Sequence, residues 1–249
     1  MIILGIYNIK GGVGKTDTSV NLAYLAAQRG NRTLVWDLDP QGASTFYFRV
    51  KPKVKGGSRG LIEGKREIHE SLKETDFLNL DLLPADFSYR AMDLVLDDAK
   101  KPTRQFERLL EPMGEDYDLV FLDCPPGITL VSEAVFRAAD ALIVPTIPTT
   151  LSERTLVELI DFIGEQPKLG GLRVMPFFSM VDRRKRLHQD LVESLPGRFP
   201  QILNQSIPYA SEVERMGIHR MPLMAFSPRS QVASAYESLW EEISGRLGL

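Results

Sequence analysis

A glycine-rich segment near the N-terminus carries residue types that bind phosphate. Residues 9–16 read Ile-Lys-Gly-Gly-Val-Gly-Lys-Thr, after an apolar run and before a helical pattern. Glycines let backbone N–H groups turn towards phosphate oxygens, and the following helix start adds a favourable dipole. In such a loop we expect Lys15 to reach the β- and γ-phosphates and Thr16 to ligate Mg²⁺. The order strand, glycine loop, helix predicts a nucleotide-binding loop made of Gly11, Gly12, Val13, Gly14, Lys15, Thr16 and Asp17.

Two details distinguish this loop from other glycine turns. The common phosphate loop begins with Gly six positions before its Lys; here that position is Ile9, and a second lysine, Lys10, follows it. A dinucleotide-binding turn would need a third glycine where Asp17 stands, so that fingerprint is not met. A turn that binds nothing is disfavoured by Gly-Lys-Thr after two more glycines at a strand end.

Acidic residues follow a second apolar run. Asp37 and Asp39 lie in the segment 36–42, Trp-Asp-Leu-Asp-Pro-Gln-Gly. Ligands of α/β sheets bind outside the carboxyl ends of the strands, where these acids are expected. The two fall on the same side of an extended segment, so one is a candidate to orient or deprotonate an attacking water and the other to help hold the metal shell. The alternative is an acidic turn that caps the next helix.

A third acid ends another apolar run. Residues 119–123 read Leu-Val-Phe-Leu-Asp, the form of a Walker B strand, whose Asp123 would hold Mg²⁺ through water. Cys124 follows it, and with no His nearby in the sequence we expect a buried small residue there and not a nucleophile.

The elements that must position these residues alternate along the chain. Short apolar runs and helical patterns follow one another, which predicts an α/β fold: a single P-loop NTPase domain over residues 1–249, with a mostly parallel, twisted sheet and helices on both faces. The segment Lys51–Arg66, rich in Lys and Gly, is predicted to be an exposed loop or short excursion. Strands are expected at Ile2–Asn8, Thr33–Leu38, Leu78–Leu83, Leu119–Asp123, Ala141–Pro145, Val174–Met180 and Ile202–Ile207. Helices are expected, among others, at Leu151–Gly164, Lys185–Leu195 and Gln231–Arg246.

Composition narrows the class of protein. The net charge of −3 means that any nucleic-acid binding must use a local patch. The single cysteine excludes a disulfide framework and a cysteine-ligated cluster within one chain. No apolar run approaches the length of a membrane span, and the N-terminus reads as a first strand and not as a signal peptide, so we expect a cytoplasmic protein.

Taken together, these motifs resemble the ParA/MinD family of deviant Walker A ATPases. The resemblance covers essentially the whole chain, and the loop with its extra lysine is its most specific part. The matching segments are Lys10–Thr16, Asn21–Ala23, Asp37–Gly42, Leu122–Pro126, Val144–Thr146, Ile207–Pro208 and Ala235–Leu239.

The resemblance implies a role for several residues. Lys10 looks like the signature lysine that reaches across a dimer to the partner's ATP, and Gly12 like the position of closest approach between subunits. Asp39 looks like the residue that positions the hydrolytic water, with Asp37 beside it, and Asp123 like the Walker B acid. Electrostatics supports an action between subunits. Lys15 is expected to contact the phosphates bound by its own loop, so Lys10 would instead neutralise charge on the phosphates bound by a second subunit. ATP and Mg²⁺ are the implied cofactors, and an ATP-dependent homodimer the implied assembly.

One residue departs from the family pattern. The family usually carries a second hydroxyl residue after Thr16, and this chain has Asp17. A carboxylate close to the α-phosphate would be repelled by it and would weaken nucleotide binding. Alternatively, Asp17 points to solvent in the first helical turn, where the helix dipole favours an acid.

The resemblance is strongest to the short, Soj-like ParA ATPases, which partition or position cargo. In that group an ATP dimer binds DNA without sequence preference, and an adaptor or ParB-like protein with a basic N-terminal peptide stimulates hydrolysis. The family thus implies a cytoplasmic, nucleoid-associated protein whose cargo is a plasmid, a chromosome or a protein complex such as a carboxysome. The one basic run that would contact DNA phosphates is Arg183, Arg184, Lys185 and Arg186.

Two alternatives of the same fold stay open. A MinD-like ATPase that associates with the membrane is disfavoured by the absence of a basic amphipathic tail after the last helical pattern. A metabolic ATP-dependent enzyme would need a substrate pocket and would not need Lys10. The adenine is expected against the loops after the late strands, near Asp182 and Pro208.

Overall fold

The computed structural model describes all 249 residues, and one eight-stranded sheet runs through the molecule. The strand order is β3-β4-β2-β5-β1-β6-β7-β8, and only the pair β3–β4 is antiparallel. The predicted α/β fold with a mostly parallel sheet is confirmed. The strands are β1 Ile2–Ile6, β2 Thr33–Asp37, β3 Lys73–Glu74, β4 Leu80–Leu83, β5 Leu119–Asp123, β6 Ala141–Thr146, β7 Arg173–Val181 and β8 Ser206–Pro208.

Twelve α-helices connect or flank these strands. They are α1 Lys15–Gln28, α2 Ala43–Tyr47, α3 Gly57–Ile62, α4 Met92–Asp97, α5 Gln105–Leu110, α6 Leu130–Ala138, α7 Thr150–Gly164, α8 Arg186–Arg198, α9 Ser211–Glu214, α10 Met216–His219, α11 Leu223–Phe226 and α12 Gln231–Leu247. Five 3₁₀ turns add η1 Ile68–Ser71, η2 Phe87–Ala91, η3 Pro102–Arg104, η4 Glu111–Glu115 and η5 Pro167–Leu169. None of the helices combines the length and the apolarity that crossing a bilayer requires.

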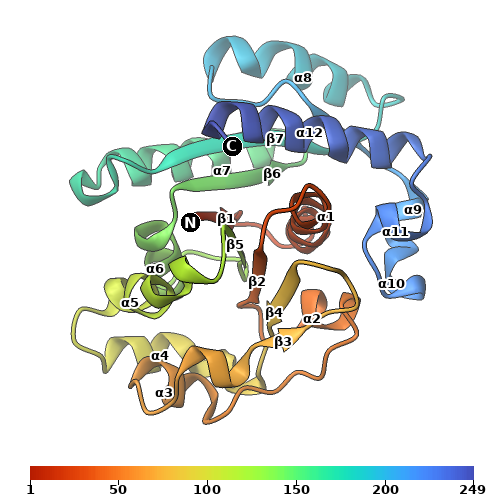
Figure 1. The fold of residues 1–249 in the computed structure, drawn as a ribbon. Helices are drawn as coiled ribbons and strands as arrows, with labels where there is room; N and C mark the ends of the chain where they lie inside the picture. The colour runs from red at the N-terminus through yellow and green to blue at the C-terminus, as the bar shows by residue number, and fades with distance from the viewer.

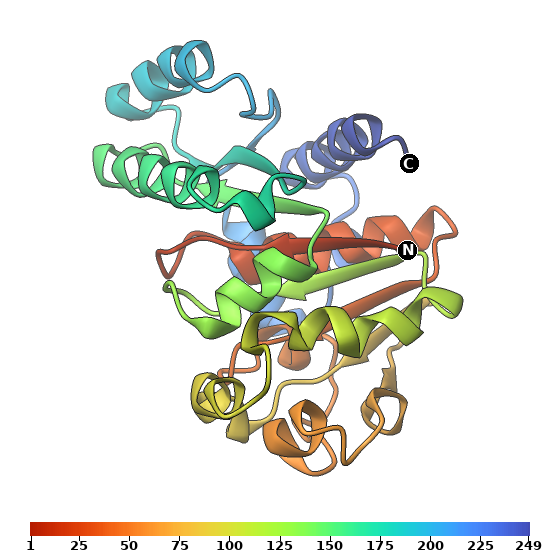
Figure 2. The ribbon, with the colours of Figure 1, turned by 90° about the vertical axis from the view of Figure 1, so that its left-hand side faces the viewer.

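Helices cover both faces of the sheet, as Figures 1 and 2 show. Successive side chains of a strand point to opposite faces. In β1, Ile3 therefore belongs to one buried cluster and Leu4 and Ile6 to the other. The first cluster is closed by α4 to α8 and the second chiefly by α1 and α12. Since both faces are buried, the central strands read as continuous apolar runs, and the sequence pattern located them well.

The last helix shows how local sequence sets an element's ends. At the start of α12, Ser230 Oγ accepts a hydrogen bond from the backbone N–H of Ala233 at 3.2 Å. At its end, Gly248 takes the left-handed conformation with φ 76°, which terminates the helix. Between these ends, Tyr236, Leu239 and Trp240 are buried against the sheet.

Three sequence expectations need correction. The segment Lys51–Arg66 is not only a loop, because it contains α3, whose Leu61 and Ile62 are buried. The strand expected at Ile202–Ile207 forms only at Ser206–Pro208. Ile202 and Leu203, whose apolar character suggested the earlier start, are buried in the connection that precedes the strand. The short edge strand β3, with both residues exposed, was not predicted.

Candidate active site

The phosphate-loop residues lie between the end of β1 and the start of α1. Gly12 and Gly14 have φ values of 70° and 88°, in the left-handed region that favours glycine. At Gly14 a side chain would also be crowded, because a Cβ atom there would lie 3.1 Å from Ser179 Oγ. The loop is therefore held in the shape that lets backbone N–H groups face a phosphate at the N-terminus of α1.

Lys15 is almost completely buried at the first position of α1, with 7% of its surface exposed. Its ammonium donates a hydrogen bond to the Lys10 carbonyl at 2.9 Å, so the side chain curls over its own loop. Burial lowers the pKa of Lys15, and the nearby carboxylates of Asp123 and Asp39 oppose that shift. A buried cation that has only a carbonyl as partner is suited to neutralise phosphate charge.

Lys10 points elsewhere. Its Nζ donates to Ser152 Oγ in the first turn of α7 at 3.2 Å, and its backbone N–H is fixed by Asn8 Oδ1 at 2.8 Å. Gly11 and Gly12 beside it are exposed, and nothing in the chain lies within 4 Å of a Cβ atom built on either. The loop thus presents two lysines in different directions, one back over the loop and one towards the start of α7.

Two carboxylates meet at the ends of neighbouring strands. Asp37 of β2 and Asp123 of β5 are partners in the parallel register, and both side chains are fully buried. One oxygen of each holds α2: Asp37 Oδ2 accepts from the Thr45 N–H at 2.8 Å and hydroxyl at 2.7 Å, and Asp123 Oδ2 accepts from Ser44 Oγ at 2.7 Å. The strand order brings together two acids that are 86 positions apart in the chain.

The remaining oxygen of each acid has no partner. Oδ1 of Asp37 and Oδ1 of Asp123 are buried without a hydrogen bond. Burial raises the pKa of both groups. The charge of Asp39 adds to the shift of Asp37, and the charge of Asp37 adds to the shift of Asp123, while interaction with the Thr16 hydroxyl offsets part of the rise at Asp123. Unpartnered carboxylate oxygens beside a hydroxyl are hard donors of the kind that Mg²⁺ prefers, so these residues fit the ion.

Asp39 is placed differently from Asp37. It is half-buried just beyond β2, where Asp39 Oδ1 accepts from the Gln41 N–H at 2.9 Å, and its charge is felt by Asp37, Asp123 and Lys15. The buried pair is thus set back in the sheet, while Asp39 stands at its surface. Both members of the expected pair lie at the site, with Asp37 tied to Thr45 and Asp39 partly accessible.

A hollow of about 230 Å³ adjoins the loop on the side of β7 and β8. Pro208, which the sequence placed near the adenine, lines it together with Gly14, Asp17, Tyr47, Ser179 and Tyr236. Asp182 lies outside this lining. Its carboxylate instead accepts from the Arg184 side chain at 2.9 and 3.0 Å and from the Arg184 N–H at 3.0 Å.

Asp17 faces the hollow and not solvent. Asp17 Oδ1 accepts from the Tyr47 hydroxyl at 3.3 Å, and burial raises the pKa of Asp17 to about 6. Of the two alternatives for Asp17, the structure does not adopt the one in which the side chain points to solvent in the first helical turn. Tyr47, Ser44 and Thr45 were not singled out from the sequence; their proximity to the motif at Asp37–Gly42 was the only available signal.

The basic run lies at the corner between β7 and α8. All four side chains are exposed. Arg184 is paired with Asp182 at 2.9 Å and Arg186 with Asp190 at 3.8 Å, whereas Arg183 and Lys185 have no ion-pair partner. Two of the four cations are free to contact another molecule.

Known proteins resemble this chain in sequence and in fold. A family model described as an AAA domain matches residues 1–169, more than half of the chain. The chain belongs to this family and, within it, to the ParA/MinD ATPases that include the Soj proteins.

Two relatives illustrate the match in sequence. The sporulation initiation inhibitor protein Soj of Bacillus subtilis is 28% identical over 247 residues, covering 97% of this chain and 98% of Soj. The chromosome-partitioning ATPase Soj of Treponema pallidum is 28% identical over 254 residues, covering 97% and 96%.

Two solved structures illustrate the match in fold. A variant of McdA from Cyanothece in complex with ATP superposes with a TM-score of 0.85 at 23% identity, covering 98% of this chain and 96% of that one. Cobyrinic acid a,c-diamide synthase from Mycobacterium smegmatis, with a bound ATP analogue and magnesium, gives 0.84 at 25% identity, covering 100% and 97%. Related proteins thus bind adenine nucleotides and magnesium on this fold.

Proposed function

We propose that this chain is an ATP-hydrolysing switch that forms a homodimer around bound ATP and positions cargo on DNA. The observation that carries the proposal is the pair of lysines on one loop. Lys15 curls over the loop's own phosphate site, so a second cation would be redundant there, whereas Lys10 points away from that site to Ser152, next to the exposed Gly11 and Gly12. A cation placed outside its own site is useful to the site of a second subunit.

The residues of one subunit then divide the work. The loop from Gly11 to Thr16 would hold the phosphates through backbone N–H groups, with Lys15 neutralising their charge. Thr16, Asp123 and Asp37 would hold Mg²⁺, which when bound offsets charge on the phosphates. Asp39, the accessible carboxylate, would orient the attacking water. The hollow lined by Pro208 would take the base, and Asp17 would weaken nucleotide affinity from its place in that lining.

Lys10 would complete the site from the partner subunit. Its present bond to Ser152 is a single contact between a cation and a neutral hydroxyl, which is readily exchanged for a phosphate oxygen. Gly11 and Gly12 are exposed and carry no side chain, so two subunits could approach each other closely at these residues. Dimerisation would thus depend on ATP, and hydrolysis would separate the subunits.

The output would be DNA binding without sequence preference. Arg183 and Lys185 are the candidate phosphate contacts, with Arg184 and Arg186 available once their ion pairs are exchanged. The protein would then be cytoplasmic and nucleoid-associated, and a ParB-like or adaptor protein with a basic N-terminal peptide would stimulate hydrolysis. Similarity to the chromosome-partitioning ATPase Soj of Treponema pallidum supports this branch.

A metabolic ATP-dependent enzyme is the second candidate. It is favoured by the likeness in fold and 25% identity to cobyrinic acid a,c-diamide synthase. In that case the chain would turn over a small molecule, and Lys10 would be dispensable.

The test is light scattering after gel filtration, with Mg·ATP or Mg·ADP present. The switch predicts a dimer with ATP only, and its loss in Lys10→Ala. The matched control is Lys168→Ala. Lys168 is exposed, has no ion-pair partner and lies just after the C-terminal end of α7, whereas Ser152, the partner of Lys10, lies at its start. An unchanged dimer or an active monomer in Lys10→Ala would favour the enzyme instead.

A further inference from the structure

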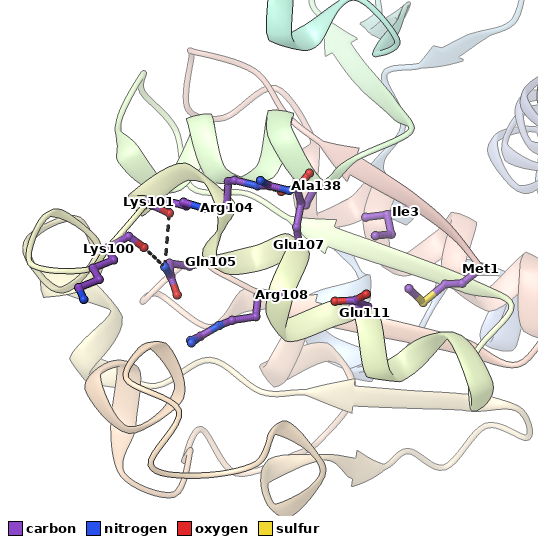
Figure 3. Close-up of a pocket in the computed structure, with 10 residues that line it drawn as sticks. All are labelled: Met1, Ile3, Lys100, Lys101, Arg104, Gln105, Glu107, Arg108, Glu111 and Ala138. Atoms are coloured by element: carbon purple, nitrogen blue, oxygen red, sulfur yellow. Dashed lines mark hydrogen bonds and ion pairs between the residues drawn. The ribbon is translucent and has the colours of Figure 1, made fainter.

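A second polar hollow lies at the opposite end of the sheet from the phosphate loop. It has a volume of about 520 Å³ and is bounded by the start of β1, the turn before α5, α5 itself and the end of α6 (Figure 3). Lys100, Lys101, Arg104 and Arg108 line it, so four of its ten lining residues are basic. Such a concentration of one charge is unusual on a chain with a net charge of −3.

The charges of this hollow do not cancel internally. Glu107 is neutralised twice, by Arg104 at 2.8 Å and by Arg137 at 3.4 Å. Lys100, Lys101 and Arg108 have no ion-pair partner. The other lining acid, Glu111, is also unpaired, but it lies at the Met1 end, away from Lys100 and Lys101 in Figure 3. The Lys100 end of the hollow thus carries three cations without an ion-pair partner.

Gln105, at the same end of the hollow, is a buried amide whose oxygen accepts no hydrogen bond. Only 7% of its surface is exposed, and its Nε2 donates to the carbonyls of Lys100 at 2.5 Å and Lys101 at 3.3 Å. These two bonds fix the amide, so its orientation is not ambiguous. Its Oε1 is buried and accepts no hydrogen bond. A buried acceptor without a donor is costly, and such groups point to a bound molecule.

Arg108 stands next to this acceptor. Figure 3 shows the Gln105 amide between the Lys100–Lys101 turn and the Arg108 side chain. Arg108 Nη2 donates to the Ile62 carbonyl at 2.6 Å, which anchors the guanidinium and leaves its other N–H groups free. A smaller hollow of about 260 Å³ is also lined by Lys100, Gln105 and Arg108, together with the acids Glu63 and Asp98, which are both paired with Arg59. Lys100, Gln105 and Arg108 thus form a wall reached from two sides.

We propose that this wall binds inorganic phosphate. The guanidinium and the two lysines supply donors and charge for an oxyanion. Gln105 Oε1 requires that the same anion donate a hydrogen bond. At neutral pH inorganic phosphate keeps at least one proton, whereas sulfate keeps none and a phosphomonoester, with a second pKa near 6, has mostly lost its own. The acceptor therefore selects free phosphate among anions of similar shape.

The experiment is calorimetric titration of the full chain at pH 7.5 with the phosphate loop saturated by Mg·ADP. Phosphate should bind at least about ten-fold more tightly than sulfate or methyl phosphate, the difference that one unmet buried acceptor produces. Arg108→Gln should weaken phosphate at least about ten-fold, and the exposed control Lys51→Gln should not. Gln105→Met should abolish the preference for phosphate over sulfate; because it also removes two bonds to the turn, its folding is checked by thermal melting.

Three results would overturn the proposal: equal affinity for phosphate and sulfate, phosphate binding that survives Arg108→Gln, or no binding up to about 10 mM. The site does not depend on the proposed switch. Phosphate binding that disappears in Lys15→Ala, and not in Arg108→Gln, would show that the loop was the site observed.

Discussion

The two polar regions with a role in the proposed switch are built in opposite ways. At the ends of β2 and β5, Asp37 and Asp123 are fully buried, and each holds a residue of α2. At the corner between β7 and α8, Arg183 and Lys185 are exposed and unpaired. Buried, oriented groups fix the geometry that chemistry needs, while exposed cations adapt to an irregular polyanion. The difference predicts that substitutions at the first region act steeply and at the second gradually.

Removing the buried cation is expected to have the largest effect. Lys15→Ala should weaken ATP binding at least about 100-fold, because a buried ammonium facing phosphate makes charge-assisted hydrogen bonds that no neighbour replaces. Equilibrium titration with a fluorescent ATP analogue measures this. Affinity within about three-fold of the native value would mean that the buried region is not the nucleotide site.

The exposed corner should respond more weakly and with a different signature. Arg183→Ala/Lys185→Ala should lower DNA affinity about ten-fold and reduce the slope of log affinity against log salt by about 2, since two phosphate contacts are lost. Binding is measured with Mg·ATP over a salt series. Lys51→Ala/Lys168→Ala removes the same charge elsewhere and should leave the slope unchanged. A slope that falls equally in both would assign the effect to net charge.

A third substitution tests whether Asp17, which replaces the hydroxyl residue usual in the family, weakens nucleotide binding. Asp17→Thr should tighten ATP binding several-fold, because the carboxylate lies in the lining of the hollow next to the loop. The substitution also removes the acceptor of the Tyr47 hydroxyl, so Tyr47→Phe serves as its control. Unchanged affinity in Asp17→Thr would exclude repulsion as the role of this residue.

The smallest expected effect is on stability. Asp123→Asn removes one charge from the buried acid pair and keeps an acceptor for Ser44. At pH 9, without nucleotide and Mg²⁺, the melting temperature should rise by about 2–4 °C, because the pKa of Asp123, raised by burial to about 8, leaves it charged beside Asp37 only at such a pH, and the substitution removes that like charge. Magnesium-dependent ATP binding should fall in the same variant. A lower melting temperature would mean that the pair is not under electrostatic strain.

The sequence predicted those parts of the fold that local pattern determines. The runs at β1, β2 and β5 are buried on both faces, so their apolar character identified them directly. It could not predict β3, which has two exposed residues, or α3, where two of the six residues are glycine and only Leu61 and Ile62 supply buried apolar surface. Elements stabilised mainly by tertiary contacts carry a weak local signal.

The site was predicted residue by residue but not as an arrangement. The motifs located Lys15, Asp37 and Asp123 one by one. That the two acids share a register position follows from the strand order β2-β5-β1, which a parallel sheet leaves open. The contact between Tyr47 and Asp17 spans 30 residues and depends on how α2 packs, so no spacing rule finds it. The sequence therefore predicts which residues can bind phosphate or metal, whereas the fold determines which of them come into contact.

The central claim is that Lys10 completes the site of a second subunit, and complementation tests it most directly. Lys10→Ala and Asp39→Ala should each be nearly inactive in ATP hydrolysis when alone. When mixed in equal amounts, the heterodimer should contain one intact site, with Asp39 from one subunit and Lys10 from the other. Random pairing would give recovery of about one quarter of native activity, which is the upper value because a heterodimer with only one Lys10 forms less readily than the native dimer. A mixture no more active than its components would contradict a lysine that acts between subunits.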